Sequence, residues 1–169
     1  MSTTRPADSD VSLVIELRAS SLFSALTLEE LLPLARTAQR KRYEAGVTIF
    51  EQGQEASHLF VIAQGRVEVV RDGHTLAELG QGEHFGEMGL LDGSLRAAAV
   101  VALSDTTLVR IARQDFNELM ELYPRLGLSV AQVLSSRIRS ASIREAARLA
   151  VAGGADSKAP ADSKAPAEG

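Results

Sequence analysis

Glycine-containing turns recur through residues 40–112 and limit every element between them to the length of a strand. They fall at Ala45-Gly46, Gln52-Gly53, Gln64-Gly65, Asp72-Gly73, Gly80-Gln81-Gly82 and Asp92-Gly93. Between these turns, apolar and polar residues alternate with a period of two, most clearly at 66–69 and 108–111. No connection is long enough for a helix that would join parallel strands. We therefore predict seven to eight short antiparallel strands that close as a jelly-roll-like β-barrel.

Helical periodicity is found on both sides of this region. Before it, an apolar face at Val11, Val14 and Ile15 predicts one helix. The capping box Thr27-Leu28-Glu29-Glu30 predicts the start of a second helix. After the strands, a helix that must end before a proline is followed by a longer one over about 125–150. The predicted fold class is α+β, mainly β, flanked by N-terminal helices and a long C-terminal helix.

Composition indicates where the folded part begins and ends. Residues 1–10 are polar and contain a proline, and residues 151–169 carry two copies of Asp-Ser-Lys-Ala-Pro-Ala. Small residues, proline and alternating charge cannot bury enough apolar surface to offset the loss of chain entropy. We therefore expect a flexible N-terminus at 1–10, one domain at 11–150 and a disordered low-complexity tail at 151–169.

Several classes of function are disfavoured by what the sequence contains. There are no cysteines, which fits a reducing compartment, and the net charge of −4 does not suit a general nucleic-acid binder. No apolar run approaches the length of a membrane span, and the N-terminus lacks the apolar block of a secretory signal. The three histidines have no metal-ligand spacing, and neither a nucleophile elbow nor a phosphate loop with its lysine is present. We expect a cytoplasmic protein that is not an enzyme and has no metal, DNA or membrane partner.

One stretch within the strand region breaks the alternation and reads FGEMGLLDGSLRAAAVV. Its Gly-Glu pair is predicted to open a single helical turn whose free N–H groups and positive dipole end form an anion site. Gly86 lets a ligand approach the backbone, Glu87 offers acceptors for a sugar hydroxyl, and Arg96 is suited to hold a phosphate. Ala97 and Ala98 leave space and present backbone N–H groups. The stretch therefore predicts a ligand with a ribose and a single phosphate charge.

The order of these motifs resembles that of cyclic nucleotide-binding domains, such as those of the bacterial catabolite activator family, protein kinase A regulatory subunits and cyclic-nucleotide-gated channels. The resemblance covers about Leu22 to Ala146. It is carried by Gly46-Val47-Thr48-Ile49 with Gly53, by Leu59-Phe60-Val61-Ile62 with Gly65-Arg66-Val67, and by the phosphate-binding cassette from Phe85-Gly86-Glu87 to Arg96-Ala97-Ala98.

The resemblance implies a role for each matching residue. Glu87 would accept a hydrogen bond from the ribose 2′-hydroxyl, Arg96 would bind the cyclic phosphate, and backbone groups at Gly86, Met88 and Ala97 would complete the pocket. Many cGMP-preferring members carry a hydroxyl residue directly after the arginine, where this chain has Ala97, so cAMP is favoured over cGMP. The chain departs from the family pattern at Leu95, where proline is common, and at Ala99, where threonine or serine is common.

The long C-terminal helix is expected to close the site. By position and resemblance, Ser140, Ala141 or Ser142 would lie nearest the base. An apolar stripe along this helix is suited to cover the barrel mouth or to pair with a second copy of the chain as a homodimer. The arginines of the helix form either a solvated face or a docking surface for an acidic partner. Only Gly153-Gly154 and the repeats follow, from which no DNA-recognition helix can be built.

Two hypotheses follow from these patterns. In the first, the chain is a cyclic-nucleotide-binding regulatory module that signals to a partner protein through its C-terminal helices. In the second, it is a degenerate fold in which Glu87 and Arg96 form a structural ion pair and the helices bind a partner without ligand.

Overall fold

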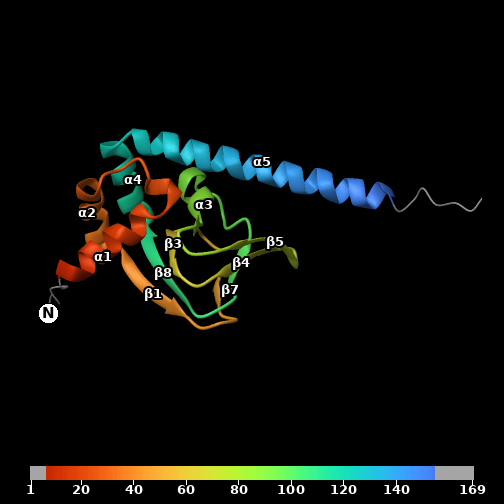
Figure 1. The fold of residues 1–169 in the computed structure, drawn as a ribbon, viewed down its shortest axis with the longest axis horizontal. Helices are drawn as coiled ribbons and strands as arrows, with labels where there is room; N and C mark the ends of the chain where they lie inside the picture. The colour runs from red at the N-terminus through yellow and green to blue at the C-terminus, as the bar shows by residue number, and fades with distance from the viewer. Residues whose placement is uncertain (1–6, 155–169) are drawn as a thin grey trace, which may run out of the picture. The chain divides into compact units, whose positions relative to one another are not determined.

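The computed structural model describes residues 7–154, in which helices precede and follow the strands along the chain (Figure 1). Contacts group the chain into two compact units, residues 1–131 and 132–169, and each is described by itself. The helices are α1 (Ala7–Arg18), a 3-10 turn η1 (Ser21–Phe23), α2 (Leu28–Thr37), α3 (Glu87–Asp92), α4 (Arg113–Leu122) and α5 (Arg125–Gly154). The strands are β1 (Gln39–Tyr43), β2 (Thr48–Phe50), β3 (His58–Gln64), β4 (Val67–Arg71), β5 (His74–Leu79), β6 (His84–Phe85), β7 (Ala99–Ala102) and β8 (Thr106–Ala112).

The strands form two four-stranded antiparallel sheets, with strand orders β1-β8-β3-β6 and β2-β7-β4-β5. This arrangement confirms the predicted jelly-roll-like fold with eight strands. The predicted turns are confirmed as well, because each contains a glycine with a positive φ, at Gly46, Gly53, Gly65, Gly73, Gly82 and Gly93. The β4–β5 hairpin is closed by Asp72 and Gly73, both with positive φ, as a two-residue turn requires.

The core of the first unit lies between the two sheets. Its buried members come from both, since Phe60, Ile62 and Leu108 belong to one sheet and Val67 and Val100 to the other. Strand alternation places these side chains inward and the neighbouring residues outward, toward helices or solvent. The packing therefore follows from the period-two pattern of the sequence.

Helix α1 buries a different face from the predicted one. Leu13, Val14 and Leu17 are buried, whereas Val11 and Ile15 are 56% and 59% exposed. The prediction was wrong for these two residues because contacts of α1 with α2, β3 and β8, which local periodicity does not reveal, set its rotation. The helix also begins at Ala7, within the segment 1–10 expected to be flexible, and residues 1–6 lie outside the described part.

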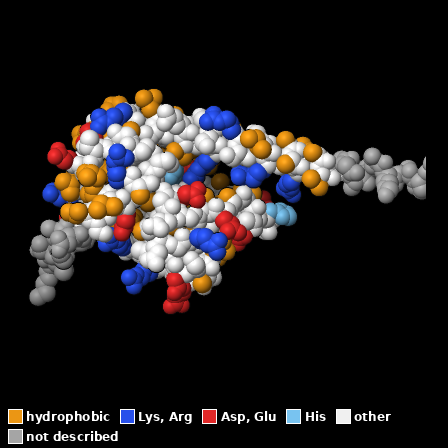
Figure 2. Space-filling view, in the orientation of Figure 1, with side chains coloured by type: hydrophobic (Ala, Val, Ile, Leu, Met, Phe, Trp, Pro, Cys, Tyr) orange, Lys and Arg blue, Asp and Glu red, His pale blue; other side chains and the backbone are white. Residues whose placement is uncertain are grey.

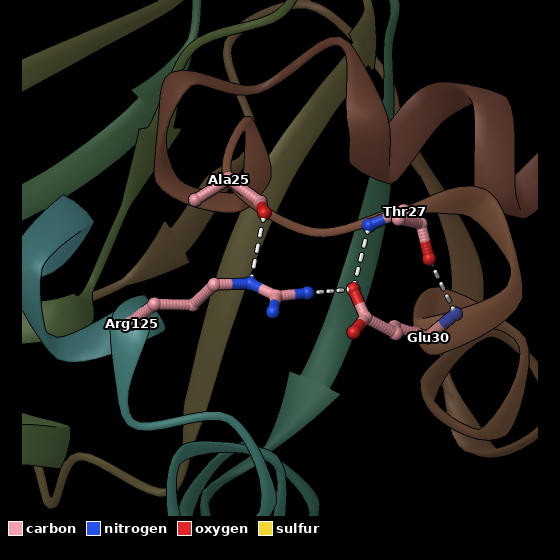
Figure 3. A network of polar contacts seen from close by, with 4 residues as sticks. All are labelled: Ala25, Thr27, Glu30 and Arg125. Atoms are coloured by element: carbon pink, nitrogen blue, oxygen red, sulfur yellow. Dashed lines mark hydrogen bonds and ion pairs between the residues drawn. The ribbon is translucent and has the colours of Figure 1, made fainter.

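The capping box of α2 is confirmed and is joined to the start of α5 (Figure 3). The Thr27 N–H donates to Glu30 Oε2 over 2.8 Å, and the Glu30 N–H donates to Thr27 Oγ1 over 3.3 Å. Arg125 donates to the same Glu30 oxygen and, through Nε, to the Ala25 carbonyl over 3.1 Å. Together these bonds lower the pKa of Glu30 below its usual value, with the Thr27 N–H as the largest cause. The Glu30 carboxylate thus caps the start of α2 and also binds Arg125 at the start of α5.

The described part of the second unit is the rest of α5, from Gln132 to Gly154. This segment carries both arginine and exposed apolar side chains, the latter including Ile138, Ile143 and Leu149 (Figure 2). Helix α5 continues four residues beyond the predicted end near Ala150, and the remaining tail, 155–169, lies outside the described part. Among the described residues, none of the helices combines the length and apolar character needed to cross a membrane.

The capping box gives a test of the N-terminal packing. Replacing Thr27 with alanine removes the side-chain acceptor for the Glu30 N–H and is expected to lower the free energy of unfolding by about 1 kcal/mol. Thr27→Ser retains the hydroxyl and should stay close to the wild type. Chemical denaturation of the three proteins measures the difference, and equal stabilities of the serine and alanine variants would contradict the assignment.

Candidate ligand-binding site

The predicted cassette folds as the short helix α3 between β6 and β7. Gly86 adopts φ +86° immediately before α3, and Gly93 adopts φ +73° immediately after it. Left-handed backbone of this kind is reached by glycine without the steric cost that a side chain brings. The two glycines therefore set where the single predicted helical turn begins and ends, and the turn is confirmed.

Glu87 is the first residue of α3, and its side chain is completely buried. A carboxylate at this end of a helix is favoured by the partial positive charge of the free N–H groups. Burying a charged carboxylate nevertheless costs free energy unless polar groups around it replace the lost water. Its place at the start of the cassette is the one predicted from the Gly-Glu pair.

Arg96 lies on the far side of the cassette and is held in place by its own backbone. Its N–H donates to the Gln54 carbonyl and its carbonyl accepts from the Gly53 N–H, each over 2.8 Å. The guanidinium is directed toward Gly86, between β6 and α3, and toward β3: Nη1 donates to the Gly86 carbonyl over 2.9 Å and Nη2 to the His58 carbonyl over 2.6 Å. Hydrogen bonds therefore hold both the backbone and the guanidinium of Arg96.

The Arg96 guanidinium is a buried cation with unused hydrogen-bonding capacity. The residue is 6% exposed, its Cζ lies 4.1 Å from the centre of the Phe50 ring, and its Nε makes no hydrogen bond within the described residues. Burial and the nearby charge of Arg113 lower the pKa of Arg96, while Glu87 raises it. A guanidinium has five N–H donors. An anion beside Arg96 would therefore gain hydrogen bonds as well as attraction to the positive charge.

Gly86 has a second role that the sequence did not predict. A Cβ at this position would lie 2.7 Å from Arg96 Nη1 and 3.2 Å from the His58 carbonyl oxygen. The space beside the Gly86 backbone, expected to admit a ligand, is thus taken by the guanidinium that is predicted to bind it. The glycine therefore permits the close contact between the two ends of the cassette.

The remaining predicted residues occupy different surroundings. Met88 is 52% exposed at the surface of α3, Ala97 is exposed and Ala98 is half-buried. Ser140 and Ser142 belong to the second unit, where Ser142 Oγ donates to the Ile138 carbonyl over 3.0 Å. The contact of these two serines with a base stays a prediction.

Three neighbours of the cassette were missed by the sequence analysis. Phe50 provides the ring beneath Arg96, His58 provides a carbonyl acceptor, and Arg113 donates to the Gly89 carbonyl of α3 over 2.8 Å. Each comes from a strand or helix distant in sequence. Only the position of Arg113, directly after a strand and at the start of a helix, offered a local signal.

Two hollows of about 510 and 520 Å³ lie away from the cassette. Both are lined by Arg42, Gln64 and Thr107, on the sheet that also contains β1 and β8. Their lining includes none of the predicted ligand residues.

The close packing of α3 predicts opposite effects for two helical glycines. A Cβ at Gly89 would lie 2.4 Å from the Cβ of Ala56 and 2.8 Å from the Ser94 carbonyl oxygen, whereas none of the surrounding atoms lies within 4 Å of a Cβ at Gly127. Gly89→Ala is expected to lower the melting temperature. Gly127→Ala, in α5, is expected to raise the free energy of unfolding by up to about 1 kcal/mol, because alanine favours helix. Thermal unfolding compares them, and a stabilised Gly89→Ala would contradict the packing.

His58 predicts a pH-dependent stability. Burial, Arg110 and Arg96 lower its pKa below the usual 6.5, while Asp115 opposes them. The unfolded chain therefore binds this proton more tightly than the folded protein, and stability is lost as the pH falls through about 6.5 toward the folded pKa. His58→Gln should flatten the pH dependence of the melting temperature between about pH 7.5 and 5. His74→Gln, on the exposed hairpin, should retain the wild-type slope, and an unchanged slope in His58→Gln would reject this origin.

Comparison with known proteins agrees with this geometry. Residues 40–123 match the family model described as cyclic nucleotide-binding domain. The Cyclic AMP receptor protein of Thermus thermophilus is 37% identical over 132 residues, which are 75% of this chain and 61% of that protein. The crystal structure of Thermus thermophilus Catabolite Activator Protein superposes with a TM-score of 0.67 at 38% identity, covering 74% of this chain and 61% of that one.

A further similar structure is the regulatory subunit of a cAMP-independent protein kinase A from Trypanosoma brucei. Its TM-score is 0.70 at 25% identity, with 83% of this chain and 50% of that chain covered. The chain thus spans about half to three fifths of the length of these relatives. From its fold, its cassette and these matches, the chain belongs to the cyclic nucleotide-binding domain proteins.

Proposed function

We propose that this protein is a cAMP-binding regulatory module of the cytoplasm, without catalytic activity of its own. The observation that carries the proposal is the buried Arg96 guanidinium, whose Nε makes no hydrogen bond within the described residues, in a cassette that also buries Glu87. A cyclic nucleotide brings one phosphate charge and one free ribose hydroxyl. These match one arginine and one carboxylate.

The preference for cAMP rests on Ala97. In many cGMP-preferring relatives of the family, the residue after the cassette arginine carries a hydroxyl that meets the guanine amino group. Ala97 cannot supply that hydrogen bond, so a guanine amino group would be desolvated without compensation. Ser140 or Ser142 of α5 would face the base. cGMP is the second candidate ligand.

Binding must exploit donors that the Arg96 side chain does not already use. Two of its N–H groups are directed to the carbonyls of Gly86 and His58, and the Phe50 ring holds the guanidinium plane. These contacts fix the fork before the ligand arrives, so less side-chain entropy is lost on binding. The carbonyls of Gly86 and His58 then support the cation without neutralising it.

The output of the module is proposed to pass through α5 to a partner protein, with a homodimer as one form of that pairing. A ligand shifts a conformational equilibrium only as far as it binds one state better than the other. The nucleotide therefore has to contact α5 more favourably in the state that the partner recognises. The exposed apolar and arginine side chains of the second unit are the proposed contact surface.

A ligand-independent interaction module is the second candidate. It is favoured by the existing contacts of Arg96, since two carbonyls and an aromatic ring already support the buried charge. The similar structure from Trypanosoma brucei is the regulatory subunit of a cAMP-independent protein kinase A, so the fold also occurs in a protein kinase A that does not depend on cAMP. The two candidates differ in whether Arg96 is required for binding or only for stability.

Isothermal titration with cAMP and cGMP distinguishes these candidates. The wild type is expected to bind cAMP saturably and more tightly than cGMP. Arg96→Ala should weaken binding by about 10- to 150-fold, corresponding to the roughly 1.5 to 3 kcal/mol of a charged hydrogen bond. Arg71→Ala removes an exposed arginine of the β4–β5 hairpin and should bind like the wild type.

Melting curves of the same proteins complete the test. A wild type that shows neither heat nor a thermal shift with millimolar cAMP or cGMP, together with a strongly destabilised Arg96→Ala, would reject the sensor and favour the ligand-independent module.

A further inference from the structure

We propose that Arg113 is a positioning residue of the site, which holds the cassette helix α3 in place without touching the ligand. Its effect on affinity rests on the proposed nucleotide binding, whereas its effect on α3 does not. Arg113 lies outside the cassette, 17 residues after Arg96 in the printed numbering. The cassette motif does not include Arg113, and the charges around it in the sequence do not mark it as a site residue.

Arg113 connects three parts of the first unit. It is the first residue of α4 and directly follows β8, and its backbone N–H donates to the Ser57 carbonyl over 3.0 Å. Its Nη2 donates to the Ala56 carbonyl over 2.5 Å and to the Gly89 carbonyl over 2.8 Å. A single nitrogen thus bridges the loop before β3 and helix α3.

Helix α3 depends on such outside support because it is short. It contains six residues, so few of its carbonyls can accept a hydrogen bond from within the helix. The Gly89 carbonyl is one that receives its hydrogen bond from a side chain. A cation at the carbonyl end of a helix is also favoured by the helix dipole.

The position that Arg113 supports is closely packed. Gly89 lies so near Ala56 that a Cβ would approach the Ala56 Cβ to 2.4 Å. Arg113 bonds the carbonyls of these same two residues. It therefore bonds both sides of the contact between α3 and the loop before β3.

The charge of Arg113 also acts on Asp92, the last residue of α3, and on Arg96. Hydrogen bonds with Ser94 are the largest causes that lower the pKa of Asp92, and Arg113 adds to them. Burial is the largest cause that lowers the pKa of Arg96, and Arg113 is the second. Arg113 therefore contacts the cassette from α4, whereas Arg96 is part of the cassette. Charge and bridging geometry are separable, because lysine keeps the first and not the planar fork.

The test measures amide hydrogen exchange without ligand and then with cAMP. Arg113→Ala is expected to reduce the protection of α3 amides at least tenfold, while β3 and β8 retain theirs, and to weaken cAMP binding about tenfold. Arg113→Lys should show the same change to a smaller extent and serves if the alanine variant does not fold. Arg110→Ala is the control, because it removes a nearby arginine on β8 that donates to Gln39 and not to α3.

Saturating cAMP supplies a readout that a purely structural role would not move. If Arg113 positions α3 for the ligand, bound cAMP should restore most of the lost α3 protection in Arg113→Ala, since coupling between two contacts is reciprocal. Unchanged α3 exchange, or equal loss of protection in β3 and β8, would overturn the proposal. A wild type that binds no cAMP would instead overturn the proposed function and leave the ligand-free exchange result to decide the role of Arg113.

Discussion

A buried positive charge is the constraint on which the rest of the site depends. Moving a guanidinium out of water costs several kcal/mol unless dipoles and opposite charges replace the lost solvation. Arg96 receives this replacement from the Gly86 and His58 carbonyls, from the Phe50 ring and from the field of Glu87. These groups come from β2, β3 and the cassette, so the charge can be buried only when both sheets have assembled. The site and the barrel are therefore formed together.

The same constraint explains the local backbone. A guanidinium hydrogen-bonded to the Gly86 carbonyl leaves no space for a Cβ at that residue, and α3 can approach the loop before β3 only if position 89 lacks one too. The two glycines on either side of Glu87 thus serve different contacts, Gly86 the one with Arg96 and Gly89 the ones with Ala56 and the Ser94 carbonyl.

Sequence reasoning succeeded where the determining interactions are local. The turn glycines, the Thr27 capping box and the Gly-Glu start of α3 involve residues within a few positions of one another, and all were predicted. It failed where packing between distant elements decides. The rotation of α1 depends on β3 and β8. The acceptors of the Arg96 and Arg113 side chains are also distant in the sequence, His58 by 38 residues from Arg96 and Ala56 by 57 residues from Arg113. A period in one segment carries no information about such partners.

These long-range contacts are also what makes the short helix α3 suitable as a responsive element. A helix of this length has little stability of its own, so its position is set by the sum of contacts on its two sides. On one side are Arg113 and Ala56, and on the other lie the buried charges of the cassette. A ligand that adds a few hydrogen bonds on the charged side changes this balance by an amount comparable to the contacts already present, each worth about 1 kcal/mol. Because Arg113 is also the first residue of α4, the same side chain links α3 to that helix.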